Sequence, residues 1–308
     1  MTRTGTFHAG FVAILGRPNV GKSTLLNRLL GEHVAIVTAR PQTTRTRILG
    51  VVNGEGWQLA LFDTPGVHAA KGVLNRRMVE VAVETLKEVD AALVIIEAGT
   101  GPGGRVEIGE GTRAVIAEVA RSRKPAVLGI NKLDRAPKAS LLPVMEAYKD
   151  LHAWTAIVPF SALTGENVDR LVEVLAAAVP ESEAPLFPED VLTDQAEKQL
   201  AAEYVREQIM LKTAQEIPYS VAVEVEAFDE SDRREDGGLV RVAALIRVER
   251  DSQKAIVIGK KGAMLKAVGT EARKRLEKLL GCKVFLSLTV KVDERWTEKP
   301  AAVKRLLP

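Results

Sequence analysis

The amino-acid sequence predicts an α/β domain followed by a smaller α+β domain. Through residues 11–180, continuous apolar runs alternate with helical patterns, which is typical of a mainly parallel sheet covered by helices on both faces. Residues 180–190, PESEAPLFPED, are rich in proline and acid and interrupt the helical pattern. Beyond them the predicted elements follow the order α-β-β-α-α-β. We therefore expect one domain at residues 1–180, a linker at 181–190 and a second domain at 191–308.

Apolar runs define the strands of the first domain, which are expected at residues 11–15, 51–52, 57–62, 91–98, 125–132 and 156–162. Helices are expected at 22–30, 74–89 and 168–179. In such a sheet, ligands bind at the carboxyl ends of the strands. Residues 97–113 are rich in glycine, so we expect a flexible loop there and assign it no role.

The second domain is expected to begin with a long helix at 194–215. Two strands follow at 219–228 and 239–249, joined by the polar loop DESDRREDGG. A short helical segment at 253–258, a longer helix ending near Leu280 and a strand at 283–293 complete the chain.

Composition limits the class of protein. The chain has 308 residues, enough for two hydrophobic cores, and one cysteine. A lone Cys282 can form neither an internal disulfide nor a tetrahedral metal site, so we expect a reducing compartment and a small residue beside a strand. No segment reads as a secretory signal or approaches the roughly 20 apolar residues of a membrane span. We expect a cytoplasmic protein, which leaves peripheral membrane contact open.

The net charge of +3 hides an uneven distribution. Residues 181–240 carry 5 Lys and Arg against 16 Asp and Glu, whereas residues 241–308 carry 17 against 7. A basic final segment suggests a surface that binds a polyanion. The alternative is an ordinary solvated surface whose charges match within the molecule.

A phosphate-binding loop follows the first strand. Residues 16–23, GRPNVGKS, fit the pattern G-x-x-x-x-G-K-[ST] between an apolar strand and a helix. In this pattern backbone N–H groups curl around a β-phosphate, Lys22 neutralises phosphate oxygens, and Ser23 offers a hydroxyl to Mg²⁺. The expected nucleotide contacts are Gly16, Arg17, Pro18, Asn19, Val20, Gly21, Lys22 and Ser23.

Three shorter motifs each follow another strand: DTPG at 63–66, NKLD at 131–134 and SAL at 161–163. Asp63 can hold Mg²⁺ through water, and the Gly66 N–H can meet a γ-phosphate. Asp134 can accept hydrogen bonds from guanine N1–H and the exocyclic amine, an arrangement of donors that adenine lacks. A backbone N–H of the SAL turn can reach guanine O6. The four motifs together predict a guanine-nucleotide site, with further contacts from Thr64, Pro65, Val67, Asn131, Lys132, Ser161 and Ala162.

These motifs resemble those of the translation-factor class of P-loop GTPases, which implies Mg²⁺-dependent hydrolysis of GTP to GDP and phosphate. Either Thr43 or Thr44 falls where this class supplies a switch threonine to Mg²⁺, and we favour Thr44. Val67 replaces the water-orienting glutamine of Ras-type GTPases, so intrinsic hydrolysis should be slow. Asn19 matches an asparagine that coordinates K⁺ in related GTPases, although it also suits a plain turn. The resemblance implies catalytic roles for Lys22, Thr44 and Asn19, and Mg²⁺ ligation by Ser23, Thr44 and Asp63.

A second glycine turn, GKKG at 259–262, lies between the short helical segment and the following long helix. Such a turn between two helices on a three-stranded sheet resembles the KH RNA-binding module, and the α-β-β-α-α-β order resembles its type II form. Lysines would meet RNA phosphates, and nearby apolar side chains would face bases. The expected RNA contacts are Ile256, Ile258, Gly259, Lys260, Lys261 and Gly262, whereas the basic run at 273–275 is expected to be a solvated helix face.

A P-loop GTPase domain joined to a type II KH domain is a specific pairing. Together with PQTTRTR, DTPGVH, SALTGEN and IPYS, it resembles the bacterial Era family over nearly the whole chain. The resemblance implies binding to the 3′ region of 16S ribosomal RNA, a role in small (30S) subunit maturation, and peripheral contact with the inner membrane. As a hypothesis, bound GTP would order Thr44 and Asp63 and so control the grip on RNA. The alternative is a membrane-associated or cell-cycle signalling GTPase whose C-terminal domain binds protein or lipid.

Overall fold

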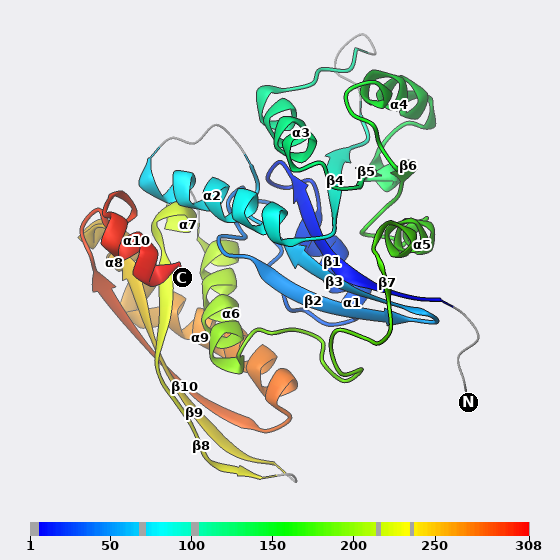
Figure 1. Ribbon diagram of the computed structural model, residues 1–308. Helices are drawn as coiled ribbons and strands as arrows, with labels where there is room; N and C mark the ends of the chain where they lie inside the picture. The colour runs from blue at the N-terminus through cyan, green and yellow to red at the C-terminus, as the bar shows by residue number, and fades with distance from the viewer. Residues whose placement is uncertain (1–5, 68–71, 100–104, 214–216, 235–236, 308) are drawn as a thin grey trace. The chain divides into compact units, whose positions relative to one another are not determined.

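The computed structural model describes residues 6–67, 72–99, 105–213, 217–234 and 237–307 (Figure 1). The chain forms two compact units. The first comprises Met1–Ala35, Pro41–Lys71 and Asn75–Asp194, and the second comprises Ile36–Arg40, Gly72–Leu74 and Gln195–Pro308. Each unit has its own hydrophobic core.

The first unit is built on a sheet in the order β2-β3-β1-β4-β5-β6. Parallel pairing joins β3, β1, β4, β5 and β6, whereas β2 runs antiparallel to β3. The predicted mainly parallel sheet is therefore confirmed. The strands are β1 (Phe7–Gly16), β2 (Ile48–Gly54), β3 (Trp57–Asp63), β4 (Ala91–Glu97), β5 (Ala126–Asn131) and β6 (Ala156–Pro159).

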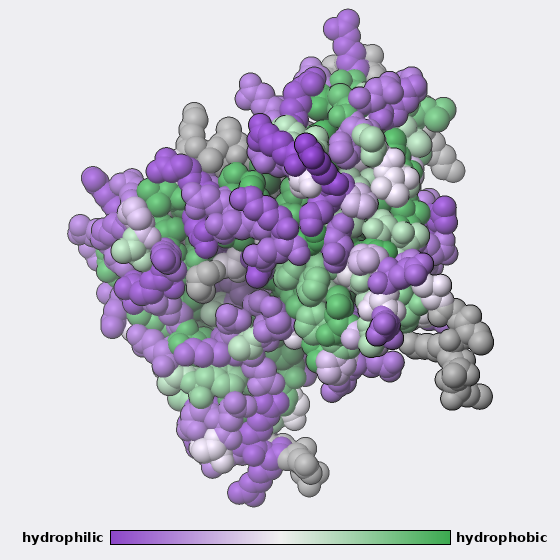
Figure 2. Space-filling model, viewed as in Figure 1, coloured by the Kyte–Doolittle hydropathy of each residue, from purple (hydrophilic) through white to green (hydrophobic). Residues whose placement is uncertain are grey.

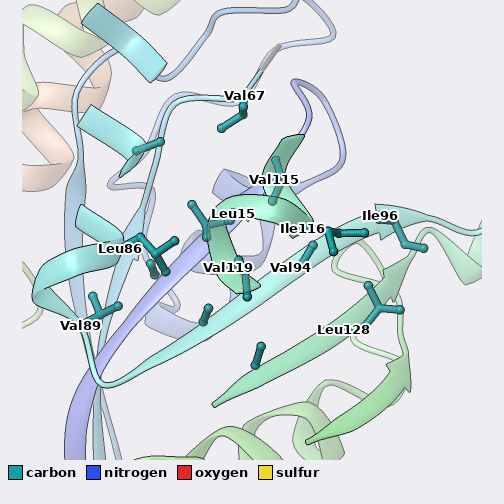
Figure 3. Close-up of a cluster of buried hydrophobic side chains, with 14 of the residues drawn as sticks. Leu15, Val67, Leu86, Val89, Val94, Ile96, Val115, Ile116, Val119 and Leu128 are labelled. Atoms are coloured by element: carbon teal, nitrogen blue, oxygen red, sulfur yellow. The ribbon is translucent and has the colours of Figure 1, made fainter. Parts of the chain in front are cut away.

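Helices cover both faces of this sheet, as its continuous apolar strands predict. They are α1 (Lys22–Leu30), α2 (Val73–Glu88), α3 (Glu110–Ser122), α4 (Leu141–Lys149) and α5 (Val168–Ala178), with short 3₁₀ turns at Leu133–Arg135 and Lys138–Ser140. Side chains of α2, α3 and α4 share one core with Ala60 and Phe62 of β3. Leu86 of α2 and Val115 of α3 are among the core side chains drawn in Figure 3. Leu59 and Leu61 alternate with these residues and are buried on the opposite face, with α1 and α5.

The glycine-rich segment 97–113 is only partly a loop. Residues 100–104 lie outside the described part, but α3 already begins at Glu110, so the loop expectation is wrong for 110–113. The buried Thr112 and Val115 explain the difference, because packing against the sheet stabilises a first helical turn that the glycines alone disfavour.

The second unit confirms the predicted α-β-β-α-α-β order. Its main elements are α6 (Glu197–Lys212), β8 (Ala222–Arg234), β9 (Gly237–Val248), α8 (Asp251–Ile258), α9 (Ala263–Leu280) and β10 (Lys283–Val292), with a short α7 (Ile217–Ser220) after α6. The sheet order is β10-β9-β8, with β9 antiparallel to β8 and parallel to β10. Helices α6, α8 and α9 pack on it through two adjoining apolar clusters, and the lone Cys282 is buried in one of them.

The polar loop expected at 229–238 is wrong over most of its length. Strand β8 continues through it to Arg234, and β9 begins at Gly237. Cross-strand pairing explains the extension, because Asp232 lies opposite Leu239 and its carboxylate accepts a hydrogen bond from Arg241 at 2.5 Å. Two register shifts, between Val225 and Ala227 and between Asp229 and Asp232, accommodate the irregular polar sequence.

Residues 181–194 lie against the first unit. A two-residue strand, β7 (Glu181–Ser182), pairs with β1, and the Thr193 hydroxyl donates to the Leu49 carbonyl at 2.6 Å. The contacts divide the chain between Asp194 and Gln195, slightly beyond the expected linker.

The end of the chain adds elements that periodicity does not reveal: a 3₁₀ turn at Trp296–Glu298 and helix α10 (Pro300–Leu306). Trp296 is fully buried, and its indole N–H donates to the Ser220 carbonyl at 2.8 Å.

Candidate nucleotide site and nucleic-acid interface

The loop between β1 and α1 has the backbone of a phosphate cradle. Gly16 and Gly21 have φ values of 152° and 100°, which favour glycine, and Asn19 is left-handed at 64°. Lys22 is buried under this loop, where its ammonium group donates to the carbonyls of Gly16 at 3.4 Å and Arg17 at 3.0 Å. The loop therefore surrounds the one cation expected to neutralise phosphate.

The three expected Mg²⁺ ligands come together although they lie on three segments. Ser23 Oγ donates to Asp63 Oδ2 at 2.5 Å and lies 2.9 Å from Thr44 Oγ1. Thr44 Oγ1 also donates to Asp63 Oδ2 at 3.2 Å. The structure thus places Thr44, rather than the neighbouring Thr43, in hydrogen-bond contact with both other groups.

The Asp63 carboxylate accepts hydrogen bonds from both of the other expected ligands. Its side chain is fully buried, and its Oδ1 atom has no hydrogen-bond partner. Burial raises the pKa of the Asp63 carboxyl, although Lys22 and the hydroxyls of Ser23 and Thr44 oppose the shift. An unpaired buried carboxylate oxygen beside two hydroxyls suits a hard cation with oxygen ligands, so these residues fit Mg²⁺.

Burial shifts the pKa of Lys22 in the opposite direction to that of Asp63. Burial lowers the pKa of its ammonium group to about 8, and the nearby Asp63 carboxylate only partly offsets this shift. Bound phosphates would favour the charged form, because an opposite charge close to a buried ammonium raises its pKa.

The DTPG turn is shaped by close approach to the phosphate loop. A Cβ atom at Gly66 would lie 2.6 Å from the Pro18 nitrogen, so only glycine fits there without a shift of backbone. The fully buried Thr64 hydroxyl donates to the Ile14 carbonyl at 2.7 Å, which ties the turn to β1. Both residues set the position of the turn.

Val67 belongs to the hydrophobic core. Its side chain is buried in the cluster that contains Leu15 and Val115 (Figure 3), and its N–H donates to the Gly16 carbonyl at 3.1 Å. The residue therefore has neither an exposed polar atom nor an orientation suited to hold an attacking water.

At the other end of the site, Asn131 connects two motifs. Its Nδ2 donates to the Val20 carbonyl at 2.8 Å, and its Oδ1 accepts from the Ala162 N–H at 2.8 Å. The exposed Asp134 accepts a hydrogen bond from Ser161 Oγ at 2.5 Å, which orients its carboxylate. Lys132 is left-handed, with φ 70°, and forms an ion pair with Glu97.

The SAL turn differs from expectation in one respect. The Ala162 N–H already donates to Asn131, and the Ser161 N–H donates to the Glu166 carbonyl at 2.9 Å. Contact between Ala162 and guanine O6 would require the first bond to be shared or exchanged. Sequence reasoning also missed Arg28, whose Nε donates to the Ala162 carbonyl at 2.5 Å and so supports this turn from α1.

The GKKG turn is a short 3₁₀ segment, Lys260–Gly262, between α8 and α9. Gly259 and Gly262 have φ values of 72° and 80°, and even Lys261 is left-handed at 50°. Lys260 and Lys261 are both exposed. The turn therefore presents two cations on backbone that a phosphate chain can approach closely.

A groove of about 430 Å³ adjoins this turn, between α9 and β10. Its walls combine apolar residues with cations, and they are lined by Gly262, Leu265, Lys266, Gly269, Thr270, Arg273, Val284, Phe285, Leu286 and Leu288. Phe285 is 60% exposed, unusual for a large apolar side chain. Such a groove can hold unstacked bases against apolar walls while lysine and arginine meet the backbone.

The two apolar residues that are expected to face RNA bases, Ile256 and Ile258, both lie on α8. Ile258 packs against a core cluster, and Ile256 is exposed on α8, so neither lines the groove. Arg273, for which the sequence predicts only a solvated position, does line it. The groove residues were missed because β10 and the GKKG turn become neighbours only when α9 packs on the sheet.

No helix in the described ranges is long and apolar enough to cross a membrane. Hydrophilic residues cover much of the face drawn in Figure 2.

The fold and the site define a P-loop GTPase domain joined to a KH domain. Comparison with known families agrees: residues 11–132 match the family described as 50S ribosome-binding GTPase, and residues 216–297 match the KH domain. The chain is 50% identical to the GTPase Era of Geobacter metallireducens over 300 residues and 48% identical to that of Geotalea daltonii over 298, with 97% of each chain covered. The chain belongs to the Era family of GTPases.

Two solved structures resemble the whole chain. One is described as Era in complex with MgGDPNP and nucleotides 1506–1542 of 16S ribosomal RNA; it is 40% identical, covers 97% of this chain and 98% of its own, and has a TM-score of 0.89. The other is a variant of Aquifex aeolicus Era bound to GDP.AlF4⁻, with 41% identity, 97% and 99% coverage and the same TM-score. Both contain a guanine nucleotide, consistent with the guanine site expected here.

Proposed function

We propose that this GTPase binds the 3′ region of 16S ribosomal RNA through its KH domain and acts in maturation of the small (30S) ribosomal subunit. The observation that carries this proposal is the groove between α9 and β10 beside the exposed Lys260 and Lys261. It is supported by the similar Era structure that contains MgGDPNP and 16S ribosomal RNA nucleotides. A signalling GTPase whose second domain binds protein or lipid is not favoured, because the matched domain is a KH domain.

In the first domain, Lys22 would neutralise the β- and γ-phosphates, and Asp134 would recognise guanine. Ser23, Thr44 and Asp63 would hold Mg²⁺, the last through water. When bound, Mg²⁺ neutralises charge on the β- and γ-phosphate oxygens. Lys22 and the N–H groups of the phosphate loop hold the triphosphate tail in place, which contributes to catalysis by positioning and by electrostatic stabilisation.

RNA binding can be tested with Lys260→Glu combined with Lys261→Glu. The wild-type chain should bind a single-stranded RNA of the 16S 3′ sequence, and the affinity should fall as salt rises because phosphate contacts release counterions. The double charge reversal should abolish this binding in a fluorescence-anisotropy titration while leaving GDP affinity unchanged.

A matched control is Lys198→Glu with Lys212→Glu, which makes the same change of charge on α6, outside the residues that line the groove. It should retain most of the RNA affinity. If the Lys260 and Lys261 reversal binds RNA as the wild type does, the proposed RNA site is wrong.

We also propose that K⁺ assists hydrolysis through Asn19, whose exposed, left-handed position in the phosphate loop supports the idea. Turnover should be faster in KCl than in NaCl at equal ionic strength, and Asn19→Ala should remove the difference. Equal rates for the wild type would refute the proposal. Peripheral contact with the inner membrane remains a prediction from the family resemblance.

A further inference from the structure

A guanidinium group from α1 holds the SAL turn by its backbone. Arg28 Nε donates to the Ala162 carbonyl at 2.5 Å, and Arg28 Nη2 donates to the Leu163 carbonyl. Gly165 leaves room for this group, because its φ is 92° and an added Cβ atom would lie 2.8 Å from Arg28 Nη1. The turn is therefore shaped around a side chain that lies 134 residues before Ala162 in the chain.

The two accepting carbonyls set the direction of the N–H groups on the same peptides. In a trans peptide the C=O and N–H bonds point in opposite directions. The Thr164 N–H, which shares a peptide with the Leu163 carbonyl, accordingly points away from Arg28 and donates to Ser161 Oγ at 3.1 Å. This hydroxyl in turn donates to Asp134. The side of the turn opposite Arg28 is thus the side of Asp134, and the Leu163 N–H is directed toward it as well.

The Leu163 N–H is the available donor of this turn. Four of the five N–H groups at 161–165 already donate within the protein, namely those of Ser161, Ala162, Thr164 and Gly165. In the described ranges, the N–H of Leu163 forms no hydrogen bond. Leu163 is 67% exposed, so the donor is not covered by a packed side chain of its own residue.

We propose that Arg28 is a positioning residue that directs the Leu163 N–H toward guanine O6. The inference rests on the proposed guanine site at Asp134 and completes its recognition of the base. Asp134 would accept from N1–H and the exocyclic amine, while Leu163 would donate to O6. The donor therefore differs from the expected one, because the Ala162 N–H is already bonded to Asn131.

The position of Arg28 on α1 explains why a single side chain can serve this purpose. Helix α1 begins at Lys22, next to the phosphate loop, and Arg28 lies six residues further, about 9 Å along the helix axis. One helix therefore carries the phosphate-binding Lys22 at its start and the support of the base-reading turn near its end.

The test compares three nucleotides bound to the full-length protein, by competition with GDP that carries a fluorescent group on the ribose. They are GDP, 6-thio-GDP, in which sulfur, a weak acceptor, replaces O6, and IDP, which keeps O6 but lacks the exocyclic amine. The wild type should prefer GDP to 6-thio-GDP by about 2- to 10-fold, the usual effect of one hydrogen bond. Arg28→Ala should bring this ratio close to one by weakening GDP. Its ratio of GDP to IDP affinity, which reports Asp134, should stay that of the wild type.

Two further variants separate positioning from loss of charge. Arg28→Lys keeps the charge but not the two parallel N–H donors, so its ratio of GDP to 6-thio-GDP affinity should lie between those of the wild type and Arg28→Ala. Arg170→Ala is the matched control, because it removes the same charge from α5, which follows the turn. Arg170 is 63% exposed and pairs with Glu173 at 2.9 Å, and its loss should leave the ratio unchanged. If Arg28→Ala does not fold, the test rests on Arg28→Lys, and a wild-type ratio for that variant overturns the inference.

The outcomes distinguish this inference from the proposed function. If Arg28→Ala weakens all three nucleotides by one common factor, or weakens none of them, Arg28 does not direct the O6 donor and the inference is wrong. A wild type that binds GDP and 6-thio-GDP equally also overturns it, while a preference for GDP over IDP still supports the guanine site at Asp134. A wild type that binds GDP and IDP equally overturns the proposed role of Asp134 and, with it, this inference.

Discussion

At the scale of single residues, the phosphate site contains two buried groups of opposite charge, the Lys22 ammonium and the Asp63 carboxylate. Lys22 and Asp63 each lie where burial favours the neutral form, and each partly restores the charge of the other. The groups that a nucleotide and Mg²⁺ would neutralise are thus already desolvated. Part of the cost of removing them from water is met when the protein folds rather than when it binds.

Lys22 gives the nucleotide-free protein a measurable pH dependence. Its pKa is about 8 in the folded protein against 10.5 ordinarily, so between these pH values the unfolded state binds the additional proton. The free energy of unfolding should therefore rise with pH across this window. Below about pH 8, burial of the charged Lys22 ammonium destabilises the folded protein to its full extent.

Binding of GDP should reverse this shift, because phosphate favours the charged ammonium. Without Mg²⁺, GDP binding at pH 8.5 should take up roughly 0.8 proton, and at pH 7 about 0.1, which calorimetry in buffers of different ionisation enthalpy measures. Lys22→Arg should show no such uptake, since arginine stays charged. Uptake that is the same at both pH values would contradict the assignment.

At the scale of elements, the GKKG turn depends on two glycines for different reasons. Gly259 has φ 72° and ψ 174°, a region open essentially to glycine, and an added Cβ atom would lie 2.6 Å from Met264 Cβ. Gly262 is left-handed, but an added Cβ atom would meet no other atom within 4 Å. Gly259 is therefore required because a side chain there would clash with Met264. Gly262 is not required for packing, and its lack of a side chain leaves the space beside the turn open.

Alanine substitutions should separate these roles. Gly262→Ala should lower the free energy of unfolding by about 1–2 kcal/mol, because alanine is disfavoured in left-handed backbone. It should also weaken RNA binding, because the added methyl group occupies the space through which RNA approaches the turn. Gly259→Ala should cost about 2–5 kcal/mol, since overpacking adds to the strain. Urea unfolding measures the first quantity and RNA titration the second; equal stabilities for the two variants would refute the distinction.

At the scale of the whole molecule, two separate cores suggest two separately stabilised units. The apolar cluster of the first unit contains no residue of the clusters around α6, α9 and β10. Nucleotide contacts are expected in the first unit and RNA contacts in the second. A ligand that binds one folded unit should therefore raise the stability of that unit first.

Scanning calorimetry can test this division. The nucleotide-free chain should unfold in two transitions, and GDP with Mg²⁺ at about 100 times its Kd should stabilise the first unit by about 2.7 kcal/mol. For a unit of this size the corresponding shift in Tm is about 5–10 °C. The second transition should move only when RNA is added. One transition that responds fully to either ligand would show that the units unfold together.

The sequence alone determined the motifs whose residues are close neighbours in the chain. GRPNVGKS, DTPG, NKLD and GKKG each carry local backbone chemistry, and apolar periodicity places each at a strand end or between helices. Only the tertiary structure decided which of them meet. In the folded chain Asp63 accepts hydrogen bonds from Ser23 and Thr44, and Asn131 is hydrogen-bonded to both Val20 and Ala162. The groove forms where α9 packs beside β10. It also extended β8 through a polar stretch and placed Ile36–Arg40 with the second unit. These features depend on contacts between residues far apart in the chain, which follow from the packing of elements and not from the periodicity within any one of them.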